Sequence, residues 1–253
     1  MVAMIKKRNL VISWCSYTWD KSRIFVKSLR GTGYMGDIVF IEGTQDPFTL
    51  TKYNWYNVKM LQWDKTKGLT EVYLSYLNEN KNNYDKVLLC DMRDVVFQRN
   101  PFDFMFDNKL HLVSEDLKIK DQILNSGWLK HAYGIKVLRL IENNRVLCAG
   151  TTYGGIIPLI EMVEKILRHV PKNSQAILNY LYWTGLLRAV VDPNDGHSVV
   201  WTIGTKIDTE HDDFYKIKDH KITTLDDVTP PVIHQYDRHP RIARILENYY
   251  ADH

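Results

Sequence analysis

Two acidic side chains, Asp91 and Asp94, follow an apolar run at residues 87–89, and Arg93 stands between them. A buried strand with polar groups at its carboxyl end is a usual way for an open α/β sheet to supply a binding crevice. Two acids this close repel each other unless a cation lies between them, and oxygen ligands favour Mg²⁺ or Mn²⁺, which hold substrate phosphates. The spacing predicts a metal site beside a phosphate; the simpler alternative is a capped turn.

A second polar cluster lies at residues 234–240, directly after an extended segment that contains Pro230 and Pro231. His234 would supply a third metal ligand, because imidazole accepts Mn²⁺, and Arg238 would bind phosphate oxygens through its guanidinium group. A structural histidine is an equal alternative, and the spacing does not choose between the two.

Two loops are expected at the same crevice. Ser16, Tyr17 and Thr18 lie between the first strand and the first helix, where an aromatic ring can stack on a base, although surface packing explains it too. Gly150 and Thr151 lie in a glycine-rich segment that we interpret as a strand end opening a helix, with N–H groups facing a ligand. A generic turn explains the second segment equally well.

The pattern of strands and helices predicts how these residues are positioned. Strand-like runs alternate with amphipathic helical runs through the first hundred residues, which predicts an α/β fold with a mainly parallel central sheet flanked by helices. The expected strands are at residues 10–14, 38–41, 58–63, 85–90, 110–114, 146–149 and 199–203. The expected helices are at 20–29, 70–77, 119–131, 156–169, 175–186 and 241–250, and residues 208–229 are expected to be irregular.

Composition limits the class of protein. The 253 residues are 45% hydrophobic and 25% charged, no linker divides them, and a single domain over residues 1–253 is expected. A net charge of +3 with scattered basic residues argues against a nucleic-acid partner. Cys15, Cys90 and Cys148 are isolated, which indicates reduced thiols and a cytoplasmic location. Neither a signal peptide nor a membrane span is expected.

Several common motifs do not apply. Residues 31–36 match G-x-G-x-x-G, but a helix precedes them and a strand follows, so they predict a helix C-cap and a turn rather than a dinucleotide site. The sequence contains no serine nucleophile elbow, Walker A loop or H-E-x-x-H helix.

The chain resembles the glycosyltransferases of the GT-A fold, which bind a nucleotide-sugar through a metal held by a D-x-D-type motif. The resemblance is carried by residues 88–98 with Asn100, Pro101 and Phe102, which are similar to the D-x-R-D-V-x-F-Q-x-x-P-F form found in bacteria, plants and large algal viruses. Further blocks resemble that branch in the same order, at residues 28–39, 148–154 and 232–238.

The resemblance implies a single Rossmann-like GT-A domain that uses Mn²⁺ or Mg²⁺. It implies that Asp91 and Asp94 contact the ribose and the metal, that His234 completes the metal site, and that residues 16–18 hold the base. Residues 174–179 are similar to the D-Q-D-I-L-N segment of retaining transferases, which makes Gln175 the candidate catalytic residue. Residues 174 and 176 depart from that pattern, because serine and alanine replace the two acids.

The expected activity is transfer of a hexosyl or deoxyhexosyl group from a UDP- or GDP-sugar to a carbohydrate acceptor in glycan biosynthesis, with retention preferred. Arg93, Arg238 and Lys67 are the available cations for the leaving diphosphate.

Inversion would instead need a carboxylate base, for which Asp192, Glu115 and Asp116 are candidates. One alternative function is a nucleotidyltransferase acting on sugar phosphates, which would be expected to have a glycine-rich basic loop where residues 13–19 contain no glycine. The other is a non-catalytic nucleotide- or carbohydrate-binding domain.

Overall fold

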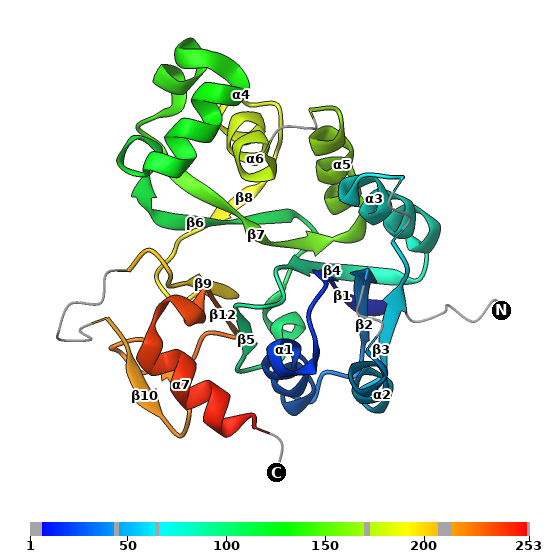
Figure 1. Cartoon of the computed structure of the whole chain (residues 1–253). Coiled ribbons are helices and arrows are strands. Elements are labelled where there is room, and N and C mark those ends of the chain that lie inside the picture. The colour runs from blue at the N-terminus through cyan, green and yellow to red at the C-terminus, as the bar shows by residue number, and fades with distance from the viewer. Residues whose placement is uncertain (1–6, 43–45, 64–65, 170–172, 207–213, 252–253) are drawn as a thin grey trace.

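The computed structural model describes residues 7–42, 46–63, 66–169, 173–206 and 214–251. Its central sheet has seven strands in the order β3-β2-β1-β4-β7-β6-β8, and all of them run parallel except β7 (Figure 1). The strands are β1 (Arg8–Cys15), β2 (Asp37–Glu42), β3 (Val58–Leu61), β4 (Tyr84–Cys90), β6 (Leu110–Lys118), β7 (Arg145–Gly155) and β8 (Val190–Asp192). The predicted fold class, a mainly parallel sheet in an α/β fold, is confirmed.

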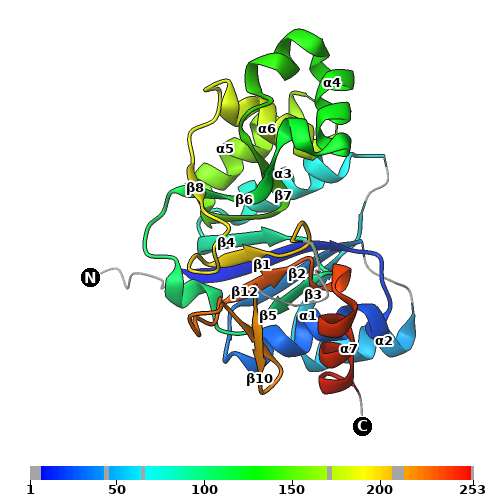
Figure 2. The same ribbon diagram turned by 90° about the vertical axis from the view of Figure 1, so that its left-hand side faces the viewer.

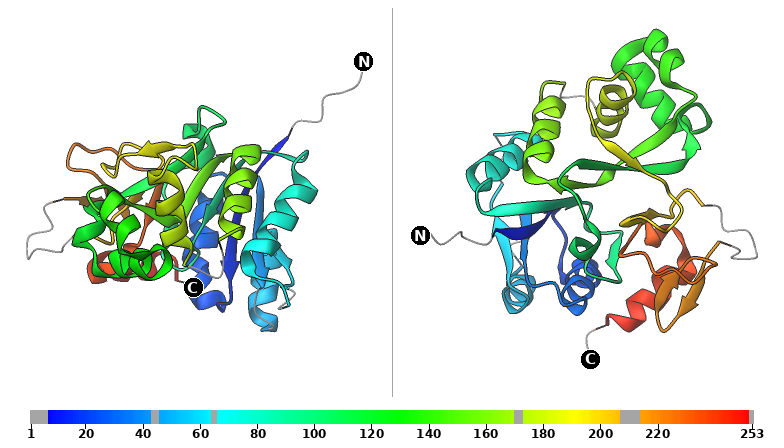
Figure 3. Two further views of the ribbon diagram at one scale, coloured as in Figure 1. Left: turned by 90° about the horizontal axis from the view of Figure 1, so that it is seen from above. Right: turned by 180° about the vertical axis from the view of Figure 1, so that it is seen from behind.

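Helices cover both faces of this sheet (Figure 2). Neighbouring side chains of a strand point to opposite faces, so Val11 of β1 packs in one core while Leu10 and Ile12 pack in the other. The first core lies under α1 (Trp19–Gly31) and α2 (Pro47–Trp55). The second lies under α3 (Leu69–Asn80), α5 (Ile156–Leu167) and α6 (Ser174–Trp183), which lie side by side when the molecule is seen from above (Figure 3).

A three-stranded sheet packs against the α1 side of the central sheet, where Phe97 contacts the ring of Phe25. It consists of β5 (Val95–Phe97), β12 (Val232–His234) and β9 (Val200–Thr202), with β12 in the middle. The remaining elements are η1 (Pro101–Phe104), η2 (Ile119–Asp121), α4 (Ile123–Ile141), the hairpin β10 (Lys216–Lys218) and β11 (Lys221–Thr223), η3 (Tyr236–Arg238) and α7 (Pro240–Tyr249).

Several sequence interpretations are confirmed and others are corrected. Helix α1 ends at Gly31, and Gly33 has a φ of +84°, so this segment is a helix end with a turn, as predicted. The three cysteines are free and buried. The sequence did not predict α2 or the β10–β11 hairpin, which lies in the segment expected to be irregular. In the described ranges, no helix is both long and apolar enough to cross a membrane.

Candidate active site

Asp91 and Asp94 lie at the carboxyl end of β4, as predicted, and backbone hydrogen bonds fix the turn that carries them. The N–H of Asp91 donates to the carbonyl oxygen of Gly150 at 2.7 Å, and the carbonyl oxygen of Asp94 accepts from the N–H of Gln235 at 2.7 Å. The turn is therefore held between β7 and the residue that follows β12. Asp94 is buried, with 7% of its side chain exposed, whereas the side chain of Asp91 is 65% exposed.

His234 is the last residue of β12 and is completely buried. Its Nδ1 lies 3.3 Å from the hydroxyl of Thr202 and 3.6 Å from the sulfur of Cys148. These contacts orient the ring so that Nε2 faces the two acids, 3.7 Å from Oδ1 of Asp94 and 3.8 Å from Oδ2 of Asp91.

The three side chains fit a divalent cation. One ligand atom from each of Asp91, Asp94 and His234 lies within 4.8 Å of the other two. Oδ1 of Asp94 and Nε2 of His234 are buried and have no hydrogen-bond partner among the described residues. Buried polar atoms without a partner are uncommon and call for an explanation. Carboxylate oxygens with one imidazole suit Mn²⁺ in particular, and Mg²⁺ through the oxygens.

The absence of a side chain at Gly150 keeps this space open. A Cβ atom at Gly150 would lie 2.6 Å from Oδ2 of Asp91 and 2.7 Å from Cε1 of His234. Any larger residue would therefore occupy the space between two of the candidate ligands.

The electrostatics of the cluster favour a positive charge. Burial raises the pKa of Asp94; His234 opposes this shift, and the charge of Asp91 adds to it. Burial lowers the pKa of His234, but Cys148 and the two acids outweigh burial and hold it well above the ordinary value. The raised pKa values mean that Asp94 and His234 each hold a proton more strongly than usual, and a cation bound between them would take the place of those protons.

The segment around Gly150 is a bulge of β7, not the helix start that the sequence suggested. The partners of β7 on β6 jump from Leu112 opposite Thr152 to Val113 opposite Cys148, so residues 149–151 have no partner on β6. On the other side Thr151 stays paired with Cys90 of β4, and the carbonyl oxygen of Gly150 accepts from the N–H of Asp91. Strand β7 continues to Gly155, which pairs with Lys86 near the start of β4. Because β7 is antiparallel to β4, the helix α5 that follows begins at the wrong end of the sheet to reach the site. Thr151 is buried in the bulge, and its hydroxyl lacks a described partner.

The loop at residues 16–18 lies at the carboxyl end of β1, next to that of β4. Ser16 and Thr18 are exposed, and Thr18 caps α1 through its carbonyl oxygen, which accepts from the N–H groups of Lys21 and Ser22. The ring of Tyr17 contacts Trp14 edge to face. The loop is thus on the predicted side of the sheet.

The three predicted cations are placed differently. Arg93 is half exposed, with Nη2 3.2 Å from Asp237 and 3.8 Å from Asp94. Arg238 is exposed and close enough to Glu115 to lower the pKa of that acid. Lys67 is exposed just before α3, and within the described residues its ammonium group forms no ion pair with the cluster.

Gln175 is joined to the bulge and to a buried acid. It lies in the first turn of α6, which Asn173 caps by accepting from the N–H of Ala176. Its Oε1 accepts from the N–H of Ala149 at 3.3 Å, and its Nε2 donates to Asn125 at 2.9 Å and approaches Glu115 at 3.5 Å. Gln175 is therefore hydrogen-bonded directly to the residue that precedes Gly150.

Of the three carboxylates suggested as bases, only Glu115 is tied to this site by the contacts of the described residues. Glu115 accepts from Gln122 at 2.7 Å, and burial raises its pKa against the opposing effects of Gln122, His234 and Arg238. Asp116 instead forms an ion pair with Lys206 at 3.1 Å.

Asp192 belongs to a separate cluster at the amino end of β6. Its Oδ1 is 3.2 Å from Nδ1 of His111, and its Oδ2 accepts from the hydroxyl of Tyr153. Nε2 of His111 bonds Asp107 at 2.9 Å. Both oxygens of Asp192 are therefore occupied, away from Asp91, Asp94 and His234.

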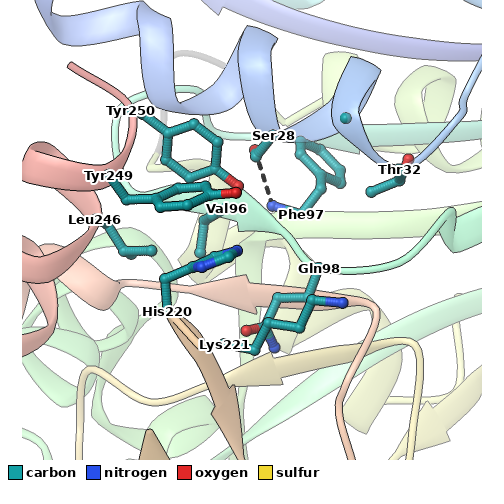
Figure 4. Close-up of a pocket in the computed structure, with 11 residues that line it drawn as sticks. Ser28, Thr32, Val96, Phe97, Gln98, His220, Lys221, Leu246, Tyr249 and Tyr250 are labelled. Atoms are coloured by element: carbon teal, nitrogen blue, oxygen red, sulfur yellow. Dashed lines mark hydrogen bonds between the residues drawn. The ribbon is translucent and has the colours of Figure 1, made fainter. Parts of the chain in front are cut away.

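A large cavity of about 340 Å³ between α1, α7 and the β10–β11 hairpin does not extend this site (Figure 4). Two of its buried polar side chains already have partners: the hydroxyl of Ser28 accepts from the N–H of Phe97, and the amide of Gln98 bonds the backbone of Ile222. The ring of His220 stacks on Tyr249. None of the acids discussed above lines it.

Comparison with known proteins gives a shared fold and no family. No family model matches the chain, and no curated protein matches it. The chain is similar to a solved apo structure of the bifunctional glycosyltransferase WbbM, with 14% sequence identity and a TM-score of 0.53. The match covers 92% of this chain and 46% of that chain, so this chain spans less than half the length of its structural neighbour. At this level of identity the likeness shows the fold alone.

Proposed function

We propose that this chain is a metal-dependent glycosyltransferase that moves a sugar from a nucleoside-diphosphate donor, UDP- or GDP-linked, to a carbohydrate acceptor. The observation that carries the proposal is the cluster at the carboxyl end of β4, where buried ligand atoms of Asp94 and His234 have no described hydrogen-bond partner. The fold shared with a protein named as a glycosyltransferase supports the same class.

In this proposal Asp91, Asp94 and His234 hold Mn²⁺ or Mg²⁺. When bound, such an ion neutralises a diphosphate and stabilises the negative charge that develops on it as the sugar leaves. Arg93 and Arg238 are exposed beside the cluster and add positive charge for the same diphosphate, with Lys67 as a more distant candidate.

The remaining residues divide between recognition and chemistry. The loop at residues 16–18 binds the nucleoside, and Gly150 and Thr151 let the backbone of β7 approach the donor. In the transfer step the acceptor hydroxyl oxygen bonds the anomeric carbon, the bond from that carbon to the diphosphate oxygen breaks, and the acceptor gives up its proton.

The transfer step can proceed with retention or with inversion at the anomeric carbon, and the two courses use different residues, Gln175 or Glu115. With retention, the leaving diphosphate takes the proton and the Gln175 amide stabilises the reacting sugar. With inversion, the Glu115 carboxylate takes the proton. The match of residues 174–179 to retaining enzymes favours the first course.

A donor-hydrolysis screen tests the proposal without knowledge of the acceptor. The chain is incubated with UDP- and GDP-sugars in Mn²⁺ or in EDTA, and release of UDP or GDP is measured. We expect slow, Mn²⁺-dependent release from at least one donor, and a loss of that release in Asp94→Asn. Nucleotide binding that is equally tight in EDTA would contradict the proposal and favour a metal-independent binding domain.

A further inference from the structure

A cavity of about 190 Å³ lies directly beside the metal cluster, between the central sheet and helices α3, α5 and α6. Asp91 lines this cavity and is also a member of the cluster. Ala149 and Ser174, the neighbours of Gly150 and Gln175, line it as well. A sugar joined to a metal-bound diphosphate must lie next to that metal, because one phosphate separates the two. This cavity is therefore in the right position for the glycosyl group of a donor.

Most of the buried side chains in the wall of the cavity are apolar. Met162, Val163 and Ile166 come from α5 and Leu178 from α6, and all four are at least nine-tenths buried. We refer to these four residues as the apolar floor. A hydroxyl group placed against this floor would lose its hydrogen bonds to water without gaining others, whereas a methyl group would gain apolar contact.

The rest of the lining combines further apolar and aromatic side chains with four polar ones, Thr70, Asp91, Thr152 and Ser174, of which only Asp91 carries a charge. Thr70 and Ser174 lie on the more exposed side, where the side chain of Asp91 is 65% exposed. Thr152 is 1% exposed, and its hydroxyl has no hydrogen-bond partner within the described ranges. An unpaired buried hydroxyl in the wall of a cavity points to a ligand that pairs with it. The ligand thus has an apolar end and several hydroxyl groups.

We propose that this cavity holds the glycosyl group of the donor and that this group is a 6-deoxy sugar. Its methyl group packs on the apolar floor, and its ring hydroxyls bond Asp91, Thr152 and the exposed rim. This inference rests on the proposed function and narrows the class of its donor. A hexose would place its 6-hydroxyl against the floor, whose four side chains carry no oxygen or nitrogen atom to pair with it.

The test uses donors that differ only in the 6-hydroxyl: GDP-mannose against GDP-rhamnose, GDP-L-galactose against GDP-fucose, and UDP-glucose against UDP-6-deoxyglucose. Hydrolysis transfers the glycosyl group to water and releases the nucleoside diphosphate, so kcat/KM is measured for each donor with Mn²⁺. We expect the deoxy member of the accepted pair to be preferred by about 10- to 100-fold, the range in which apolar pockets discriminate.

Two variants locate the preference in the cavity. Val163→Thr replaces a floor methyl group by a hydroxyl of nearly the same size and should reduce the preference for the deoxy donor. Val26→Thr makes the same change at a buried position of α1 outside the cavity and should leave the ratio unchanged. Thr152→Val should raise KM for the donor without loss of thermal stability, because the hydroxyl it removes has no described partner.

The outcomes separate the inference from the function on which it rests. If a donor is hydrolysed with Mn²⁺ but the hexose member is used equally well or better, the 6-deoxy assignment is wrong and the proposed function stands. If Val163→Thr and Thr152→Val alter only the KM of an acceptor, the cavity belongs to the acceptor and the assignment is likewise overturned. If no nucleotide-sugar binds with Mn²⁺, both proposals fail.

Discussion

Two clusters in this molecule contain the same residue types, two aspartates and a histidine, yet they differ in how their hydrogen bonds are used. At the amino end of β6, Asp107 and Asp192 bond the two ring nitrogens of His111 at 2.9 and 3.2 Å. At the carboxyl end of β4, Nε2 of His234 lies 3.7 and 3.8 Å from the acids and forms no hydrogen bond with a described residue.

The difference shows that residue types alone do not define a metal site. The His111 cluster is satisfied internally, and the hydroxyl of Tyr153 closes it by donating to Asp192. The His234 cluster uses Thr202 and Cys148 to orient the ring and leaves the opposite nitrogen for another partner. We therefore infer a structural role for the first cluster and propose metal binding for the second.

The largest expected effect comes from making the same substitution, aspartate to asparagine, once in each of the two clusters. Asp94→Asn should weaken Mn²⁺-dependent nucleotide binding by about 100-fold or more, because it removes a ligand where even supporting residues cost about 10- to 100-fold. Stability should not fall, since burial disfavours the Asp94 charge. Asp192→Asn should leave binding unchanged and reduce the free energy of unfolding by about 1–3 kcal/mol, because His111 and Tyr153 lose a charged partner. Calorimetry measures the nucleotide affinity of each variant, and urea unfolding measures its free energy of unfolding. If Asp192→Asn lost nucleotide affinity and Asp94→Asn lost only stability, the roles of the two clusters would be the reverse of those proposed.

A smaller loss is expected from removing the histidine. His234→Ala should weaken metal-dependent nucleotide binding by roughly tenfold, because the two carboxylates remain as oxygen ligands. The matched change His111→Ala should leave nucleotide affinity unaltered. Affinity is measured at limiting Mn²⁺, and an unchanged value in His234→Ala would remove His234 from the ligand set.

Closing the space beside the ligands should have a still smaller effect. In Gly150→Ala the new methyl group would force Asp91 or His234 to move, and we expect about a tenfold loss of nucleotide affinity, the lower end for a disturbed metal ligand. Gly127→Ala is the control, because a Cβ there has no described atom within 4 Å. Equal affinities in the two variants would argue against an ion between Asp91 and His234.

The weakest expected effect is the pH dependence of the satisfied cluster. Burial lowers the pKa of His111, but its bonds to Asp192 and Asp107 outweigh burial and raise it above the ordinary value. The protonated ring therefore stabilises the fold most fully below the unfolded pKa of about 6.5, and this contribution is lost as the pH rises through the folded pKa. Urea midpoints of the wild type and His111→Asn between pH 5.5 and 8.5 should converge as the pH rises. A constant difference would show that His111 acts without its charge.

The sequence predicts the strands and the acids well because both depend on local pattern. Short continuous apolar runs identify β1 and β4 as buried strands, and an acid directly after a buried strand is recognisable without knowledge of the fold. That His234 would reach Asp91 and Asp94 followed from the resemblance and from residue chemistry, and the geometry brings the three together.

Other features depend on contacts that local pattern does not contain. In the sequence Gly154 and Gly155 are typical of a turn, yet both belong to β7. Glycine is needed at these two strand positions because the backbone of residues 108–110 lies too close to leave room for a side chain. The bulge at Gly150 follows from the register of β6 against β7. The sequence offers Glu115, Asp116 and Asp192 as equal candidate bases, and only tertiary contacts distinguish Glu115, which bonds Gln122 and approaches Gln175.

Direct titration of Mn²⁺ tests the central claim most simply. The electron paramagnetic resonance signal of free Mn²⁺ is followed as the chain is added, with and without UDP or GDP, in the wild type and in Asp94→Asn. We expect the wild type to take up one Mn²⁺ per chain, more tightly with the accepted nucleotide, and Asp94→Asn to take up none in the same range. Equal uptake by both proteins would contradict the assignment of the Asp91–Asp94–His234 cluster as the metal site.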